Sequence, residues 1–167
     1  MRGDEFRKHA DSFFETDFLT FTLARLLGPD MVRHLIPFNI PLDNRADALE
    51  KVIAHGSSDD LLNRYFEKPF TEFLDTTGVL PALFINTTQV DNGMPGVIGT
   101  VVLPESSQRQ DVLSLVDSMA LKSDYNNIRL STAAILSSRF PYVSPAGKVF
   151  DRYYVDGGYF DNSGAGT

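Results

Sequence analysis

The chain has 167 residues, of which 43% are hydrophobic and 22% are charged. This length and composition are typical of one globular domain with a sizeable core, and they exclude extensive disorder. The net charge of −7, with no basic run, argues against a nucleic-acid partner, because phosphate contacts need clustered cations. The absence of cysteine excludes disulfides, thiolate nucleophiles and zinc–cysteine sites.

The first third of the sequence has the apolar spacing of helices. One stripe spans residues 17–27, and the Gly-Pro pair that follows is expected to end that helix. A second stripe spans residues 46–53, and a third runs from Asp59 to Leu74 with an interruption at Pro69. The phenylalanines of these helices form either a helical core, which we favour, or a surface that meets lipid.

Strand signals begin after residue 80. Residues 83–90 are rich in β-branched and aromatic side chains, and Asp91-Asn92-Gly93 is a strong turn signal before a second strand at 97–103. The two strands are expected to pair as an antiparallel hairpin. Helices followed by strands are compatible with an α+β domain and equally with the later part of an α/β domain.

The last third combines a short helix with a strand. Ser131 is a possible N-cap for a helix over 132–138, and Pro141 limits how far that helix can extend. Residues 153–155 read as a strand that runs directly into Asp156-Gly157-Gly158.

Asp156 is the strongest candidate for chemistry. Open α/β sheets bind their ligands at strand ends, and a carboxylate lies at such an end here. We expect Gly157 or Gly158 to adopt a positive φ and to let another backbone approach the carboxylate. Taken alone, Asp-Gly-Gly is more often a plain turn. The three histidines have no metal-ligand spacing, and we expect neither a metal nor a cofactor.

Several stretches together resemble the patatin-like phospholipases. Residues 130–145 are a Ser-rich segment followed by Phe-Pro and a second proline, as precedes the family's Asp-Gly-Gly/Ala motif. Residues 80–93 resemble the family's hairpin, in which an asparagine precedes a glycine turn, and 153–164 contain the motif itself. Residues 17–30 and 42–50 are similar to the helical insertion of larger bacterial members.

The resemblance implies an α/β fold, namely part of a three-layer α/β/α patatin-like domain. Residues 1–75 would be its helical insertion, and residues 79–167 its sheet-forming part, with the hairpin and the catalytic-aspartate strand. It also implies a lipid acyl hydrolase with a Ser–Asp dyad. In this family a serine on a Gly-x-Ser-x-Gly turn attacks the ester, and a glycine-rich loop supplies the oxyanion hole. The implied base is Asp156, followed by Gly157 and Gly158.

The nucleophile half of such an enzyme has no counterpart in these residues. The sequence contains neither Gly-x-Ser-x-Gly nor a glycine-rich oxyanion loop, so we interpret the chain as an internal fragment that is inactive alone. Its expected partners are the remainder of the parent domain and a lipid or other ester, with possible interfacial membrane contact. We expect a cytoplasmic or peripheral membrane location.

Two other functions stay open. The chain could be a non-catalytic module of the same ancestry that binds lipid or a protein. It could also be an unrelated α+β interaction domain in which Asp-Gly-Gly is a turn. A glycine-flanked serine in the upstream coding sequence would favour the enzyme, and an Asp156 away from any cleft would favour the unrelated domain.

Overall fold

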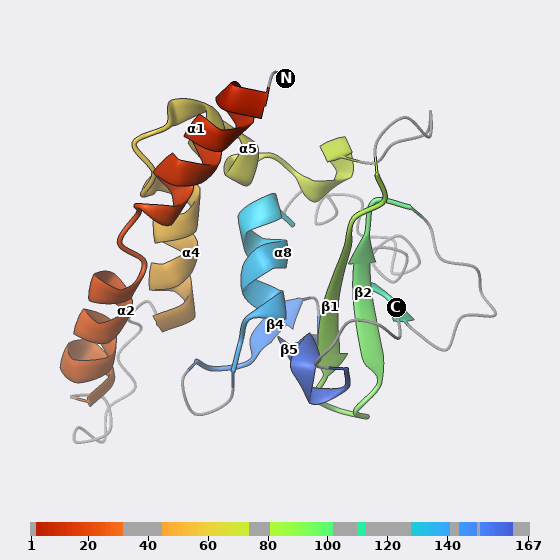
Figure 1. Ribbon diagram of the computed structural model, residues 1–167. Coiled ribbons are helices and arrows are strands. Elements are labelled where there is room, and N and C mark those ends of the chain that lie inside the picture. The colour runs from red at the N-terminus through yellow and green to blue at the C-terminus, as the bar shows by residue number, and fades with distance from the viewer. Residues whose placement is uncertain are drawn as a thin grey trace. The chain divides into compact units, whose positions relative to one another are not determined.

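The computed structural model describes residues 3–31, 45–73, 81–101, 110–112, 128–140, 144–149 and 151–161. The chain divides into two compact units, Met1–Glu67 and Lys68–Thr167, here named unit 1 and unit 2. The described part of unit 1 is helical, whereas unit 2 contains a mainly antiparallel sheet with a helix against it (Figure 1). The protein therefore belongs to a mixed α/β class.

Unit 1 contains the helices α1 (Gly3–Phe14), α2 (Leu19–Arg25), α4 (Arg45–His55) and α5 (Asp60–Glu67). Asp17 caps α2, because its Oδ1 accepts hydrogen bonds from the backbone N–H groups of Leu19 (3.1 Å) and Thr20 (2.9 Å). The expected stop after residue 27 is wrong. The chain continues as a π-helical turn, η1 (Leu26–Asp30).

Small residues on α4 allow the helices of unit 1 to pack closely. Ala46, Ala48, Val52 and Ala54 are all buried, and α4 packs against both α2 and α5. The phenylalanines of these helices differ in their burial and contacts. Phe13 stacks on Phe66 with ring centroids 5.5 Å apart, whereas other large apolar side chains are exposed, including Phe6, Phe14, Leu19, Phe21, Leu27 and Met31.

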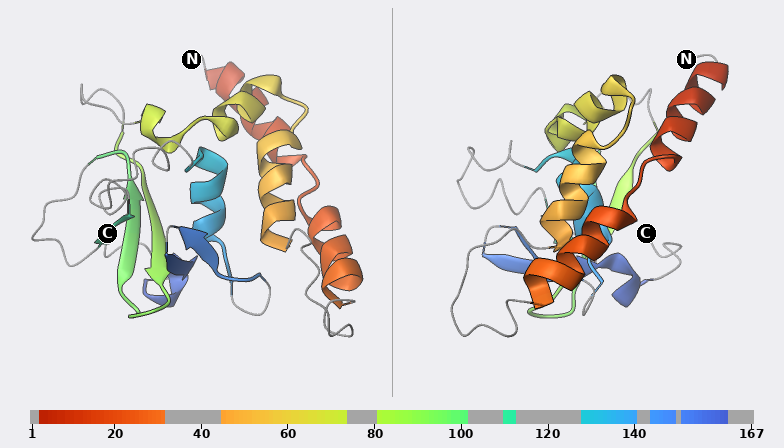
Figure 2. Two further views of the ribbon diagram at one scale, coloured as in Figure 1. Left: turned by 180° about the vertical axis from the view of Figure 1, so that it is seen from behind. Right: turned by 90° about the vertical axis from the view of Figure 1, so that its left-hand side faces the viewer.

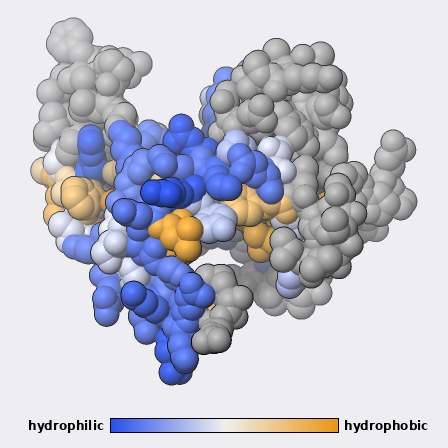
Figure 3. Space-filling view, turned by 90° about the horizontal axis from the view of Figure 1, so that it is seen from above, coloured by the Kyte–Doolittle hydropathy of each residue, from blue (hydrophilic) through white to orange (hydrophobic). Residues whose placement is uncertain are grey.

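The surface of the described residues that is visible in Figure 3 is mostly hydrophilic, with hydrophobic residues in separate patches. No helix within the described ranges has the length and apolar character that crossing a bilayer requires.

Unit 2 is built on a five-stranded sheet with the order β3-β2-β1-β5-β4. Its strands are β1 (Phe84–Gln89), β2 (Pro95–Gly99), β3 (Gln110–Asp111), β4 (Gly147–Val149) and β5 (Arg152–Asp156). Neighbouring strands are antiparallel except β2 and β3, which are parallel. The expected hairpin is confirmed: Phe84 pairs with Gly99 and Thr88 with Pro95. Its turn contains Gly93 at φ 67°, a conformation that glycine adopts without steric cost.

Helix α8 (Leu130–Ser137) packs against β1 and β5, and the views in Figure 2 show it alongside the sheet. Ser131 is not its N-cap. Arg129 occupies that position, and Ser131 lies within the helix and is fully buried, because the helix begins two residues earlier than its sequence signal indicates.

The core of unit 2 lies between α8 and the sheet. Its buried cluster contains Phe70, Ile98, Val112, Ile128, Ala133, Leu136, Val149 and Tyr154. Phe70 comes from a short 3-10 helix, η2 (Phe70–Phe73), that follows the expected interruption at Pro69. The backbone N–H of Phe70 donates to the carbonyl of Ile128 at 2.7 Å, which attaches this segment to the residues before α8.

Candidate active site

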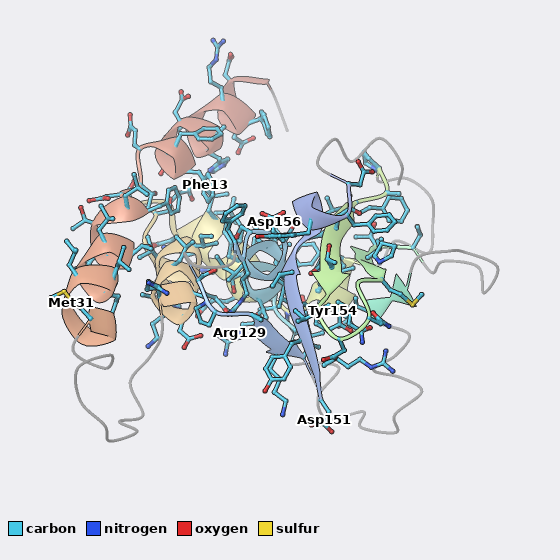
Figure 4. The ribbon with its side chains drawn as sticks, turned by 90° about the horizontal axis from the view of Figure 1, so that it is seen from below. Phe13, Met31, Arg129, Asp151, Tyr154 and Asp156 are labelled. Atoms are coloured by element: carbon cyan, nitrogen blue, oxygen red, sulfur yellow. The ribbon has the colours of Figure 1, made fainter. Side chains whose placement is uncertain are left out.

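The sheet places Asp156 at the carboxyl end of β5, as expected from the sequence. β5 lies between β1 and β4, and Asp156 pairs with Thr87 of β1. Its backbone N–H donates to the carbonyl of Arg139, just beyond α8, at 2.9 Å. Figure 4 shows Asp156 and Asp151 at opposite ends of this strand. Two other elements therefore hold the backbone of Asp156.

The Asp156 carboxylate is bound at one oxygen and open at the other. Oδ1 accepts the backbone N–H of Gly158 at 2.6 Å and so caps the 3-10 helix η3 (Gly157–Tyr159). Oδ2 has no hydrogen-bond partner among the described residues. A short hydrogen bond to a backbone N–H orients a carboxylate, and the second oxygen remains able to accept a proton.

The half-buried Asp156 lines a cavity of about 320 Å³. Phe140, Gly158 and Tyr159 line it as well, and the centroids of the two aromatic rings are 5.7 Å apart. About half of the surface of each aromatic residue is exposed (53% and 51%). Among the described residues that line it, the cavity thus combines the Asp156 carboxylate with two aromatic rings.

The expected positive φ at Gly157 or Gly158 is wrong. Both lie in η3, and Gly93 is the glycine with positive φ within the described ranges. Gly157 is required for close packing instead. A Cβ on it would lie 2.6 Å from Cβ of Asn86 and 2.7 Å from the Asn86 carbonyl carbon and oxygen. The glycine therefore lets the Asn86 backbone of β1 approach residue 157 at the strand end.

Asn86 and Thr87 connect the hairpin to this strand end. The Thr87 hydroxyl is buried and donates to the carbonyl of Val155 at 2.7 Å. Two of the segments noted in the sequence, the hairpin at 80–93 and the Asp-Gly-Gly segment at 153–164, are thus in contact.

Arg139 is a positioning residue that sequence reasoning missed. Its side chain is buried, and its Nη1 donates to the carbonyl of Pro145 at 3.1 Å. Gly147 leaves room for it, since a Cβ there would lie 2.7 Å from the Arg139 Nε. Its own carbonyl holds the Asp156 N–H. The arginine lies between a Ser-rich helix and Phe-Pro in the sequence, but nothing in that pattern indicates burial.

None of the described residues that line this cavity is a serine. Ser131 is fully buried, Ser57 belongs to unit 1, and Ser163 lies outside the described residues. The site therefore holds a candidate base without a nucleophile in the part of the chain that the structure describes.

A second group of reactive side chains lies in unit 1. His9 of α1 donates from Nδ1 to Asp59, and Ser12 contacts Ser57 at 3.1 Å and Ser58 at 3.0 Å through their hydroxyl oxygens. The hydrogen bond from His9 is the largest influence on the pKa of Asp59, which it lowers.

No serine hydroxyl is hydrogen-bonded to His9 among the described residues. A nucleophile–base pair requires that contact, so we interpret the group as a polar connection between α1 and the start of α5. Nowhere in the described ranges do three or more histidine or acidic side chains gather as a metal site would require.

No family model, curated protein or solved structure matches the chain.

Proposed function

We propose that this chain is the base-carrying part of a serine-dependent lipid acyl hydrolase of the patatin-like type. The observation that carries the proposal is the Asp156 carboxylate, held at one oxygen and open at the other beside an aromatic-walled cavity. The nucleophilic serine and the oxyanion loop would come from outside these residues. The parent fold would then be a three-layer α/β/α domain, with residues 1–75 as its helical insertion and residues 79–167 as part of its sheet layer.

The proposed reaction uses Asp156 as the general base in both half-reactions. A serine hydroxyl loses its proton to the carboxylate while its oxygen attacks the ester carbonyl carbon. That proton passes to the leaving alcohol oxygen as the C–O bond breaks, and an acyl-serine remains. Water then attacks the acyl carbon, gives its proton to Asp156, and the serine regains a proton as the fatty acid leaves.

The contacts around Asp156 are compatible with this role. Beyond its local turn, the backbone of Asp156 is held by the Arg139 carbonyl and by its pairing with Thr87. The backbone N–H of Gly158 removes rotational freedom from the carboxylate. Such positioning accounts for much of the rate advantage of intramolecular catalysis, with effective molarities of about 10⁵–10⁸ M in well-oriented systems.

A non-catalytic lipid- or protein-binding module is the second candidate. The exposed side chains of Phe14, Leu19 and Phe21 favour it, because they provide apolar surface without requiring a nucleophile. For the hydrolase the proposed partner is a lipid or other ester, with hydrophobic contact at a membrane surface and a cytoplasmic or peripheral membrane location, and for the module it is a lipid or a protein.

The decisive test compares Asp156→Asn with Asp151→Asn in the longest parent protein. Both changes remove one carboxylate charge, but Asp151 lies at the other end of β5 and is 96% exposed. Asp156→Asn should lower kcat for a p-nitrophenyl ester by at least about 10²-fold, and Asp151→Asn should leave it unchanged. An equally active and stable Asp156→Asn protein would favour the binding module.

A fluorophosphonate probe gives an independent check. It should label the parent protein at a serine and should leave the 167-residue chain unlabelled. Labelling of the 167-residue chain would contradict the proposal, because none of its serines has the glycine-flanked turn that presents a nucleophile.

A further inference from the structure

Helix α2 and the turn η1 carry a row of large apolar side chains on one face. Its members are three or four residues apart, a spacing that places side chains on the same face of a helix. They are Leu19, Leu23, Leu26, Leu27 and Met31, with exposed fractions of 70%, 49%, 36%, 65% and 54%. We name this row the α2 stripe. Met31, labelled in Figure 4, lies at its end.

The partly buried polar residues of α2 lie away from the stripe. Arg25 lines a cavity together with Ala48 and Val52 of α4, and α2 packs against α4 within unit 1 (Figure 1). The Thr22 hydroxyl donates to the carbonyl of Phe18 at 3.0 Å. A surface helix normally turns its apolar side to the core and its polar side to water. The orientation of α2 is the reverse, which leaves its apolar face open to another apolar surface.

The stripe offers no charge to a partner. Arg25 is the one charged residue between Phe18 and Gly28. It is two residues from both Leu23 and Leu27, a spacing that does not share a helix face. A nucleic acid or a highly charged peptide would therefore meet no complementary group on the stripe. The net charge of −7 also opposes an anionic membrane, so the charge pattern matches a zwitterionic lipid surface.

The stripe is small for an interface between two copies of the chain. A helix from residue 19 to residue 31 is roughly 20 Å long and about 10 Å wide. Two such faces packed together would bury less than the roughly 1,000 Å² that a specific protein interface needs. A bilayer surface requires no minimum area and no matching shape, because apolar side chains of an interfacial helix enter it one by one.

We propose that the α2 stripe inserts into the surface of a zwitterionic phospholipid bilayer, with the helix axis parallel to the membrane plane. The five apolar side chains enter the boundary between headgroups and acyl chains, and Arg25 and α4 stay on the aqueous side. The helix lies in the surface and does not cross it, since about 20 apolar residues are needed for a span. The proposal rests on the lipid partner given under the proposed function and names the element that contacts it.

The test is co-sedimentation of the 167-residue chain with phosphatidylcholine vesicles. The chain should pellet with the vesicles, and raising the salt concentration to 1 M should not release it, because the contact is hydrophobic. Replacing a third of the lipid by phosphatidylserine should weaken binding. Absence of binding to phosphatidylcholine would overturn the proposal, and so would binding that requires the anionic lipid.

Paired variants locate the contact. Leu23→Gln with Leu27→Gln should lower the vesicle partition coefficient at least about tenfold. The control, Val90→Gln with Met94→Gln, removes two exposed apolar side chains from unit 2 (50% and 42% exposed) and should leave partitioning unchanged. All four positions are exposed, so the urea midpoints should agree with that of the unsubstituted chain. Equal partitioning of the two double variants would overturn the proposal.

A fluorescent reporter gives direct evidence of insertion, because the chain contains no tryptophan. Leu27→Trp should show a blue-shifted emission on addition of vesicles and quenching by lipids brominated on the acyl chain. Met94→Trp should show neither change. An unshifted Leu27→Trp emission in a chain that pellets with vesicles would contradict the proposal.

Two further outcomes separate this proposal from its alternatives. Sedimentation velocity without lipid should show a monomer, and a dimer abolished by Leu23→Gln with Leu27→Gln would make the stripe an interface between copies instead. An active parent enzyme alongside a 167-residue chain that ignores vesicles would contradict the membrane contact alone. Vesicle binding together with a fully active Asp156→Asn parent would contradict the hydrolase alone.

Discussion

Gly157→Ala tests the contact between the hairpin and the end of β5. The added Cβ would lie 2.6 Å from Cβ of Asn86 and 2.7 Å from its carbonyl carbon and oxygen. Carbon atoms in favourable contact are about 3.5–4.0 Å apart, so one of the two segments must move by about 1 Å. The obstructing atoms belong to the backbone and Cβ of β1, and no side-chain rotation can relieve the collision.

The expected loss follows from the cost of overpacking a well-packed region. Such substitutions typically lower the free energy of unfolding by about 1–3 kcal/mol, and we expect a value within this range. Gly157 does not have a positive φ, so backbone strain adds nothing. The displacement would also move Asp156, and in the parent protein kcat should fall more than stability alone explains.

Urea unfolding of the 167-residue chain, followed by circular dichroism, measures the effect. Gly93→Asn is the matched control in unit 2, since a Cβ at residue 93 meets no atom within 4 Å and asparagine tolerates a positive φ. The control should change the free energy of unfolding by less than about 0.5 kcal/mol. A Gly157→Ala chain as stable as the unsubstituted chain would refute the packing argument.

Two further predictions concern other hydrogen bonds. Thr87→Val keeps the side-chain shape but leaves the buried Val155 carbonyl without the Thr87 hydroxyl, so the free energy of unfolding should fall by about 1 kcal/mol; an unchanged urea midpoint would argue against that bond. The pKa of Asp59 is lowered, chiefly because His9 donates a hydrogen bond to its carboxylate. The ionised Asp59 carboxylate therefore adds to the free energy of unfolding above the unfolded-state pKa of about 3.9. This contribution is lost as the pH falls through the folded-state pKa. The stability difference between the unsubstituted chain and Asp59→Asn should therefore disappear on acidification, and a difference that persists at pH 2 would contradict this assignment.

Local sequence signals predicted the features that depend on neighbouring residues. The Asp91-Asn92-Gly93 turn and its flanking strands paired as expected, since a tight turn sets the register of a hairpin. Proline at residue 69 marked the end of a helix, because it lacks a backbone donor. The short strand β4 escaped notice because three residues are too few to show a period. The family resemblance and the proposed activity stay predictions.

The sequence by itself determined that Asp156 follows a strand and precedes two glycines, because those preferences are local. The tertiary structure decided which groups surround the carboxylate. It paired β5 with β1 in an antiparallel ladder, in which a hydrogen bond joins residues 68 positions apart. It also buried Arg139 where its carbonyl holds the Asp156 N–H. In the folded chain, Gly157 lies close to Asn86 and does not have a positive φ. Contacts between segments far apart in the chain depend on how the sheet and α8 pack, and no local periodicity records them.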